Sequence, residues 1–521
     1  MFRRTLVLIL LSFSFLLKTG HGLQFGVSPI GASLKYFTYL GGSENDKGIS
    51  VAVEPSGNIY VGGVTWSPNF PTKKAFQSAC RGGRYCHDAF LTKIDQSGRK
   101  LLFSTFLDHR NVEYMTGITI DKEGNIYICA QFTGFMTTSH PTPGGGFVAK
   151  FDNSGNLIYK TSLNIRGFTA PEAIAVDDSG NAYVAGWMPS SSYEPGGNKH
   201  VQRWPLLPSE TSGRIRMPST EIERSEGFAS SVSERDAFVF KLDGSGRIIK
   251  EALIEREGDD CVYAIALNSN GDVYLTGLTS SEDFPSVNPL QIPGVTSTRK
   301  RMAGNTDSFV AKLDMTKGEL IYSTIFGGSS RDAGYALALD SRGGVYIAGG
   351  TASSDFPTLN PAQEAKAGGA DSFLAKFDEN EHKLQFSTYL GAGSLDIAVS
   401  LALDRDGAAY LAGTTQSRDF PVLNAAGLND GCKNTANCVD AFIAKVDLNE
   451  HKIVAGRFGG DKFEKATGIA IDTSGGVYVV GSTRSEGLGS PNALRRSLRG
   501  VQDAFIVKFE KLELKQKVPV N

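Results

Sequence analysis

The sequence lacks an excess of charge of either sign. It contains 53 basic and 55 acidic residues, which leaves a formal net charge of −2. Proteins that attract nucleic acid or anionic lipid through their overall field carry a strong positive bias. We therefore expect no nucleic acid among the partners of this chain.

The sequence also lacks the motifs of the common catalytic classes. None of the seven His falls in a metal-ligand spacing, and there is no nucleophile elbow, P-loop or H-E-x-x-H segment. The glycine run at 144–146 is not followed by a helix pattern that could hold a phosphate, and the Asp-rich turns lack the EF-hand spacing. These absences favour a protein without a familiar catalytic centre and imply no organic cofactor.

Long apolar runs are absent except at the N-terminus. There, Arg3 and Arg4 precede an apolar stretch at 6–17 that only two serines interrupt, and small residues allow a cut after Gly22. The stretch is shorter than the roughly 20 residues of a spanning helix and matches the layout of a secretory signal peptide. We expect residues 1–22 to be a signal peptide, with a retained anchor as the alternative, and the protein to be secreted, periplasmic or on the cell surface.

Cysteine is scarce, with six residues in the chain. Cys80 and Cys86 enclose five residues, as do Cys432 and Cys438, and both pairs precede an Asp-Ala-Phe by the same spacing. In an exported protein, two equivalent close pairs predict two small-loop disulfides. Free thiols or a metal clip are the alternatives.

What the sequence does contain is one pattern repeated seven times. In the fifth copy, residues 321–326, 335–340, 345–349 and 371–378 are short β-rich stretches separated by Gly, Asp and Ser. We name these stretches D, A, B and C in that order. The recurring residues are a Tyr in B (Tyr60, Tyr127, Tyr183, Tyr274, Tyr346, Tyr410, Tyr478), a Phe in C (Phe90, Phe147, Phe238, Phe309, Phe373, Phe442, Phe505), a Lys three residues later (Lys93, Lys150, Lys241, Lys312, Lys376, Lys445, Lys508) and a Gly in the A–B turn (Gly57, Gly124, Gly180, Gly271, Gly343, Gly407, Gly475).

The repeated residues predict a β-propeller. Stretch A is apolar on both faces and carries Ala in six of seven copies, as expected for a strand buried near a central axis. The chain opens with a lone D at 36–42 and ends with a C at 503–509, so the first segment can complete the last copy and close the ring. We therefore predict an all-β fold, a seven-bladed β-propeller of four-stranded antiparallel blades over residues 34–510, closed by the N-terminal strand.

Three motifs carry a family resemblance. They are Tyr-Leu-Gly-Gly at 39–42, the Phe-Pro that ends the stretch after B (at Phe70, Phe284, Phe356 and Phe420), and Asp-Ala-Phe-x-x-Lys in C. With these motifs the chain resembles the bacterial seven-bladed β-propeller repeat family. The resemblance implies an exported, mostly uncharacterised group of proteins and says little about activity.

Two copies depart from this pattern. Copies two and three lack the Phe-Pro stretch, and copy two has Gly145-Gly146 before Phe147 in place of Asp-Ala. Copy three carries an insertion at 188–235 that is rich in Ser, Pro and charge, and we expect it to be a flexible surface excursion. We expect the tail at 511–521 to be unstructured.

Acidic residues recur where the chain enters stretch A. The seven equivalent positions hold six acids and Thr169, the acids being Asp46, Glu113, Asp260, Asp332, Asp396 and Glu464. If A lines the axis, these carboxylates ring one mouth of a channel, where they would attract a cation such as calcium. The alternative is that each acid accepts backbone N–H bonds in its own D–A turn or pairs with a base of the next blade.

The Lys of stretch C has a structural interpretation. An antiparallel blade brings it level with the residue that ends A, which is Glu54, Asp121, Asp177, Asp340, Asp404 or Asp472, and Asn268 in the fourth copy. We expect these side chains to form ion pairs within or between blades.

These observations favour an exported, monomeric, non-catalytic binding or scaffold propeller. The B–C connections are long and varied while the A–B turns are short and uniform, and variable loops on a rigid scaffold are the usual place for recognition. The ligand would be a protein or a glycan. One alternative is a propeller hydrolase or lyase that uses the acids at the channel mouth. Another is a passive structural protein of the cell envelope.

Overall fold

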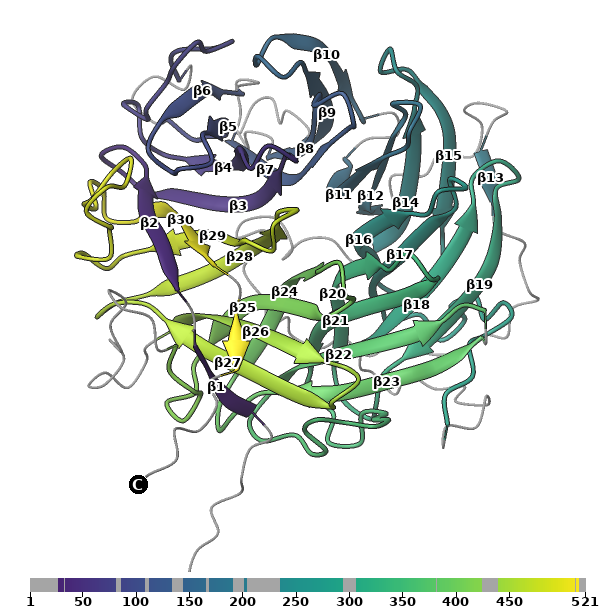
Figure 1. The fold of residues 1–521 in the computed structure, drawn as a ribbon. Helices are drawn as coiled ribbons and strands as arrows, with labels where there is room; N and C mark the ends of the chain where they lie inside the picture. The colour runs from purple at the N-terminus through teal and green to yellow at the C-terminus, as the bar shows by residue number, and fades with distance from the viewer. Residues whose placement is uncertain are drawn as a thin grey trace, which may run out of the picture.

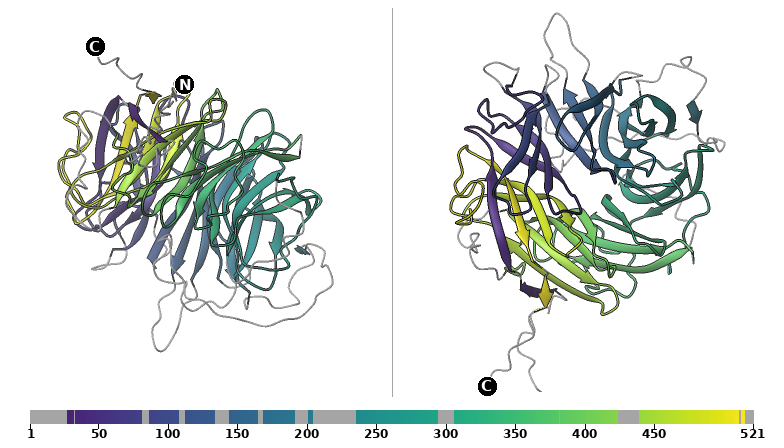
Figure 2. Two further views of the ribbon diagram at one scale, coloured as in Figure 1. Left: turned by 90° about the horizontal axis from the view of Figure 1, so that it is seen from below. Right: turned by 45° about the horizontal axis from the view of Figure 1, so that its top comes forward.

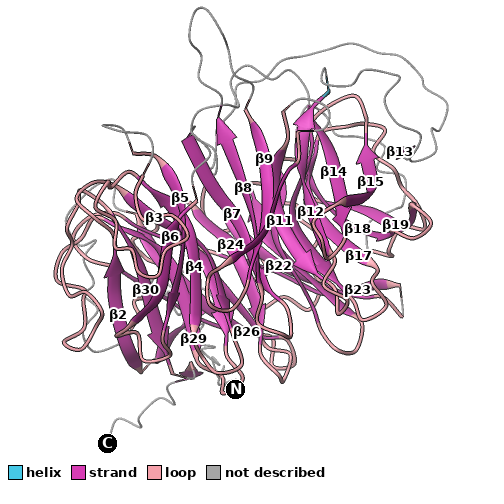
Figure 3. Ribbon diagram, turned by 90° about the horizontal axis from the view of Figure 1, so that it is seen from above, coloured by secondary structure: helices cyan, strands magenta, loops and turns pink. Residues whose placement is uncertain are grey.

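The structure is a ring of sheets around a central axis (Figure 1). It is a computed structural model that describes residues 27–31, 33–80, 86–107, 112–133, 144–164, 168–190, 201–203, 235–293, 306–380, 382–423, 439–510 and 512–514. These residues form strands and loops and no α-helix (Figure 3), and none of them belongs to a helix that could cross a membrane. The predicted signal peptide and most of the predicted insertion lie outside them.

Seven blades of four antiparallel strands make up the ring, as predicted. From the axis outward, blade 1 has β3 (Asp46–Val53), β4 (Ile59–Thr65), β5 (Asp88–Ile94) and β6 (Leu101–Phe106), and blade 2 has β7 (Val112–Ile120), β8 (Ile126–Thr133), β9 (Gly145–Phe151) and β10 (Leu157–Ser162). Blade 3 has β11 (Ala170–Val176), β12 (Ala182–Pro189), β14 (Arg235–Leu242) and β15 (Ile248–Ile254), and blade 4 has β16 (Asp260–Leu267), β17 (Val273–Thr279), β18 (Asp307–Asp314) and β19 (Glu319–Phe326). Blade 5 has β20 (Asp332–Leu339), β21 (Gly344–Thr351), β22 (Asp371–Asp378) and β23 (Lys383–Leu390), and blade 6 has β24 (Asp396–Leu403), β25 (Ala409–Thr415), β26 (Asp440–Asp447) and β27 (Lys452–Phe458). Blade 7 has β28 (Glu464–Ile471), β29 (Val477–Thr483), β30 (Asp503–Phe509) and β2 (Leu34–Leu40).

The N-terminal strand closes the ring. β2 pairs antiparallel with β30, with Phe37 opposite Val507 and Leu40 opposite Ala504. Phe37 is fully buried and its ring stacks on Phe505 with centroids 5.2 Å apart. The N-terminal strand is therefore the outermost strand of the last blade, in an antiparallel sheet with β30, β29 and β28, which confirms the predicted interlock.

Three short strands lie outside the predicted pattern. β1 (Val27–Gly31) pairs parallel with β27, β31 (Glu513–Leu514) pairs with β1, and β13 (Val201–Arg203) pairs parallel with β15. The expectation of an unstructured tail from 511 onward is therefore wrong for residues 512–514, because Leu512 is also buried in the apolar core. These strands cover outer sheet edges, which otherwise present unpaired backbone groups.

The innermost strands share a feature that the sequence pattern did not indicate. In β20 the pairing with β21 shifts between Gly334 and Ala336, so Tyr335 is an extra residue in a β-bulge. The other six inner strands bulge at the same place, with Ile49, Thr116, Glu172, Tyr263, Val399 and Thr467 as the extra residues. A bulge bends a strand and increases its twist, and here it acts on each blade next to the axis.

Long B–C connections fold back over the blades. After β21, Phe356 packs on Phe373 with ring centroids 4.6 Å apart. Leu359 then exchanges two backbone hydrogen bonds with Ser387 of the outer strand β23, at 3.0 and 2.8 Å. The connections thus cap outer strand edges, which explains why these blades exceed the ~40–45 residues of minimal propeller repeats. Figure 2 shows the ring of sheets from two further directions.

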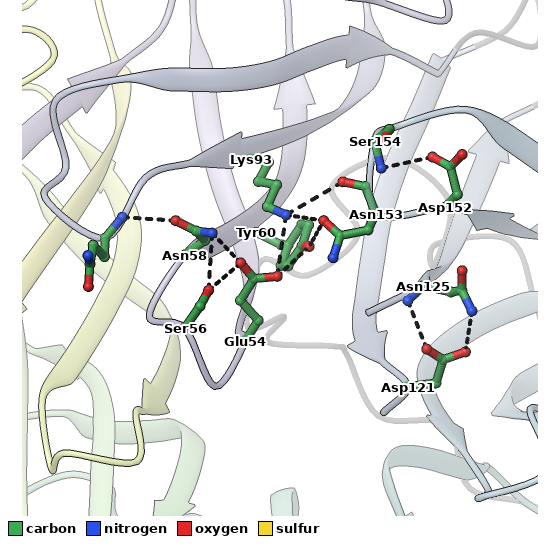
Figure 4. A network of polar contacts seen from close by, with 11 residues as sticks. Glu54, Ser56, Asn58, Tyr60, Lys93, Asp121, Asn125, Asp152, Asn153 and Ser154 are labelled. Carbon is green, nitrogen blue, oxygen red and sulfur yellow. Dashed lines mark hydrogen bonds and ion pairs between the residues drawn. The ribbon is translucent and has the colours of Figure 1, made fainter. Parts of the chain in front are cut away.

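A cluster of Lys, Tyr and an acid recurs at the A–B turn end of each blade. In blade 1 (Figure 4), Oε2 of Glu54 accepts hydrogen bonds from the Tyr60 hydroxyl at 3.0 Å and from the Lys93 ammonium at 3.3 Å, and Lys93 also donates to Asn153 of blade 2. Each of the seven Lys lies 4.5–5.1 Å from the centroid of its Tyr ring.

The predicted ion pairs of these Lys are confirmed. Their Nζ atoms lie 3.1–3.9 Å from a carboxylate oxygen of the acid that ends strand A in six blades. In the fourth blade, where the acid is replaced by Asn268, Lys312 pairs at 3.1 Å with Asp272. The pairs are largely shielded, since the Lys376 and Asp340 side chains are 16% and 8% exposed.

We predict that Lys376→Met lowers the free energy of unfolding by roughly 2–3 kcal/mol, because it leaves the shielded Asp340 without its charged donor. Urea unfolding measures the change. Lys317→Met is the matched control, because Lys317 is 71% exposed in its pair with Asp314 and should change stability by less than about 1 kcal/mol. Equal losses in the two variants would contradict a structural role for the repeated Lys.

We also predict that a chain beginning at residue 43 fails to unfold cooperatively, because it lacks β2 and leaves the edge of β30 open. Thermal unfolding and size-exclusion chromatography measure the effect, with a chain beginning at residue 23 as the control. A truncated monomer with an unchanged melting temperature would show that closure by β2 is unnecessary.

Candidate functional site

The six predicted acids open the inner strands. Asp46, Asp260, Asp332, Asp396 and Glu464 are the first residues of their strands, and Glu113 is the second residue of β7. All six are at most 1% exposed. The open acidic ring expected at a channel mouth is therefore not what the structure shows, since these carboxylates are buried within the wall of the ring.

Four of the acids, Asp46, Asp332, Asp396 and Glu464, organise the turns that lead into their own strands. Oδ2 of Asp332 accepts hydrogen bonds from the Gly328 N–H at 2.7 Å and from the Ser353 hydroxyl at 2.8 Å. The same two bonds form at Asp46 with Gly42 and Ser67, and at Asp396 with Ala392 and Ser417, at 2.6–2.9 Å. This is the alternative in which the acid accepts N–H bonds from its own D–A turn. Cation binding by the six acids stays a prediction.

A second acid faces the first across the junction between blades. The N–H of Asp396 donates to the carbonyl oxygen of Ala370 at 2.8 Å, which places Asp396 beside Asp371 of the preceding blade. Equivalent bonds join Asp46 to Gln502, Asp332 to Thr306 and Glu464 to Val439. The facing pairs are Asp88 with Glu113, Asp236 with Asp260, Asp307 with Asp332, Asp371 with Asp396, Asp440 with Glu464, and Asp503 with Asp46.

A glycine makes room for each close approach. A Cβ atom on Gly41 would lie 2.6 Å from both Asp46 Oδ2 and Asp503 Oδ1. A Cβ on Gly459 would lie 2.5 Å from Glu464 Oε2 and 2.7 Å from Asp440 Oδ1. The first Gly of the Tyr-Leu-Gly-Gly motif is thus required by the two carboxylates that pack over it.

Burial and like charge shift the titration of these acids. Burial raises the pKa of Asp46 to about 7, and the facing Asp503 adds to the rise. Burial likewise raises the pKa of Asp371 to about 6, with a further contribution from Asp396. Two buried carboxylates side by side resist being ionised together unless a positive charge joins them.

Sequence reasoning singled out the acids of strand A and missed their partners. The partners are the Asp residues of the Asp-Ala-Phe motif, which served only to recognise strand C. A signal was present, because the one strand C that begins with Gly145 precedes the one strand A entered through Thr169. The two acids are lost together at that junction, as expected for residues in contact.

The structure joins Cys80 and Cys86 in a disulfide with their Cα atoms 5.7 Å apart. Cys432 and Cys438 lie outside the described residues. Within the described ranges, one group of three His, Cys, Asp or Glu side chains is close enough to share a metal ion, and it consists of these two cysteines and Asp88. Cys129 and Cys261 are buried, and burial raises the pKa of Cys129 to about 12, so this thiol is not poised to react.

Four segments of the chain match the family described as Beta-propeller repeat, at residues 35–71, 321–357, 385–421 and 465–489. The first three run from a D strand through the next A and B strands to the Phe-Pro motif. A regulatory protein, FlaEY of Caulobacter vibrioides, is 27% identical over 142 residues, which are 27% of this chain and 14% of that protein. The match therefore covers a small part of the length of FlaEY.

The solved structures to which the chain is similar are distant from it in sequence. A protein of unknown function from Bacteroides caccae is 13% identical, with 71% of this chain and 99% of that chain covered and a TM-score of 0.32. Another protein of unknown function, from Dyadobacter fermentans, is 10% identical over 92% of this chain and 99% of that chain, with a TM-score of 0.41. The structure is thus a seven-bladed β-propeller, and four segments of its chain match the beta-propeller repeat.

Proposed function

We propose that this protein is an exported, non-catalytic binding module that recognises a protein or glycan with its B–C connections. One observation carries the proposal, the contrast between the two types of connection. The seven A–B turns are alike, each with a Gly at φ between 77° and 88°. The B–C connections differ widely, spanning 66–87, 134–144, 190–234, 280–306, 352–370, 416–439 and 484–502. Variation on a rigid frame is typical of a recognition surface.

The alternative of a hydrolase or lyase gains no support from the inner-strand acids. A catalytic carboxylate must reach its substrate within hydrogen-bonding distance. Asp332 and Asp396 are 1% and 0% exposed, and each already accepts bonds from its own blade. The alternative of a passive envelope protein shares the export step and differs in having no ligand.

Export is supported by the N-terminal pattern and by the Cys80–Cys86 disulfide, because disulfides persist mainly in oxidising compartments. We predict that the chain expressed in a bacterium with its own N-terminus is recovered from the periplasm or the medium and begins at Leu23. Cell fractionation and N-terminal sequencing measure this outcome. Cytoplasmic recovery of a chain that still begins at Met1 would contradict export.

We predict that binding to a panel of purified envelope polysaccharides and extracellular proteins depends on the B–C connections. Phe76 and Val501 lie on two of them and are 55% and 66% exposed. The double variant Phe76→Asp, Val501→Asp should raise the dissociation constant at least about tenfold for a ligand held by these side chains. Each substitution removes an apolar contact that the bound ligand would bury. Ser341→Asp in an exposed A–B turn is the control. Turnover of a glycan or ester that Asp332→Asn abolishes would favour the enzyme instead.

A further inference from the structure

The junctions between blades deal with the charge of their acids in different ways. Between blades 2 and 3 the acids are absent, and Asn164 bridges the gap by accepting bonds from the Gly146 N–H at 3.0 Å and the Thr169 hydroxyl at 3.3 Å. Between blades 6 and 7 the chain supplies its own cation, since the Arg457 guanidinium lies 2.6 Å from Oδ2 of Asp440. One junction avoids the charge and the other neutralises it.

The junction between blades 5 and 6 does neither. Asp371 and Asp396 are both 0% exposed. Their Oδ2 atoms are held by the N–H groups of Ala367 and Ala392, at 2.7 and 2.6 Å. Their Oδ1 atoms accept no hydrogen bond from any described residue. Two buried carboxylates are thus fixed side by side, each with one oxygen left over.

The basic side chain Lys366 acts on this pair but does not bond to it. Lys366 acts on Asp371 through its charge, but its ammonium donates to the carbonyl oxygens of Gly368 and Gly369. Burying an ionised carboxylate without a compensating charge costs several kcal/mol. A positive charge from solution would remove that cost.

We propose that the blade 5–6 junction binds one divalent cation of the calcium and magnesium class, with Oδ1 of Asp371 and Oδ1 of Asp396 as its charged ligands. The surrounding groups supply oxygen, including the Ser417 hydroxyl 2.7 Å from Asp396 Oδ2, and oxygen ligands select hard cations over zinc or copper. With two carboxylates and neutral oxygens, the dissociation constant should be about 10⁻⁴–10⁻³ M, as in extracellular calcium modules. The site differs from a shared ring at the channel mouth because it is built between two neighbouring blades.

The test uses the full-length protein treated with a chelator and dialysed. Calcium chloride at about 5 mM should raise the melting temperature by about 2–5 °C relative to sodium chloride of equal ionic strength, since a ligand that binds only the folded state stabilises it. Asp371→Asn should bind one equivalent less calcium by equilibrium dialysis with elemental analysis and should show a smaller shift. Asp406→Asn, at an exposed A–B turn position, is the control and should behave like the wild type.

Two results would overturn the proposal. One is a wild-type protein that binds no calcium or magnesium at millimolar concentration and whose melting temperature responds only to pH, which would mean that the pair shares a proton. The other is undiminished calcium binding in Asp371→Asn. If Asp371→Asn does not fold, Asp396→Asn takes its place in the test, because Asp396→Asn removes the other ligand. Recognition through the B–C connections is measured separately, so a failure here leaves the proposed function unaffected.

Discussion

The structure depends on a buried carboxylate that lies at the start of six of its seven inner strands. In blades 1, 5 and 6 its two hydrogen bonds tie the turn after strand D to the Ser that follows strand B, as at Asp332 with Gly328 and Ser353. The backbone N–H of the same residue bonds to the previous blade. One residue therefore fixes the entry of the chain, the end of its own blade and the spacing to its neighbour. Apolar packing between sheets has no direction of its own, so these bonds provide the register.

A second polar layer lies at the opposite end of the inner strands. There the Lys of strand C, the Tyr of strand B and the acid that ends strand A meet, as Lys376, Tyr346 and Asp340 do in blade 5. Between the two layers the blades are packed with apolar side chains such as Ile347 and Leu374, both fully buried. Six of the seven blades are thus apolar slabs with a buried carboxylate at one end and a shielded Lys pair at the other.

The sequence predicted the repeat number, the strand order, the closure by the first strand and the Lys ion pairs, because each depends on side chains that recur at fixed spacing. It did not predict the bulges of the inner strands, since residues as different as Tyr335 and Thr116 occupy the extra position and leave no pattern. The sequence led us to expect the acids of strand A at an exposed mouth of the channel. The alternation of residues along a strand shows which side chains share a face of the sheet. It does not show how closely the next blade covers that face. The facing Asp residues were missed for the same reason.

The junction between blades 2 and 3 shows that two blades can be joined without a pair of acids. Gly145 and Thr169 replace both acids there, and Asn164 makes neutral hydrogen bonds in their place. The strands on either side, β9 and β11, still take their normal positions in the ring. The chain can therefore join two blades without buried charge, and replacing charged pairs by neutral groups is often stabilising. Six junctions keep the acids although a neutral solution exists in the same molecule. If the pair at the blade 5–6 junction holds a cation, as proposed, that ion supplies the positive charge that Arg457 supplies at the blade 6–7 junction.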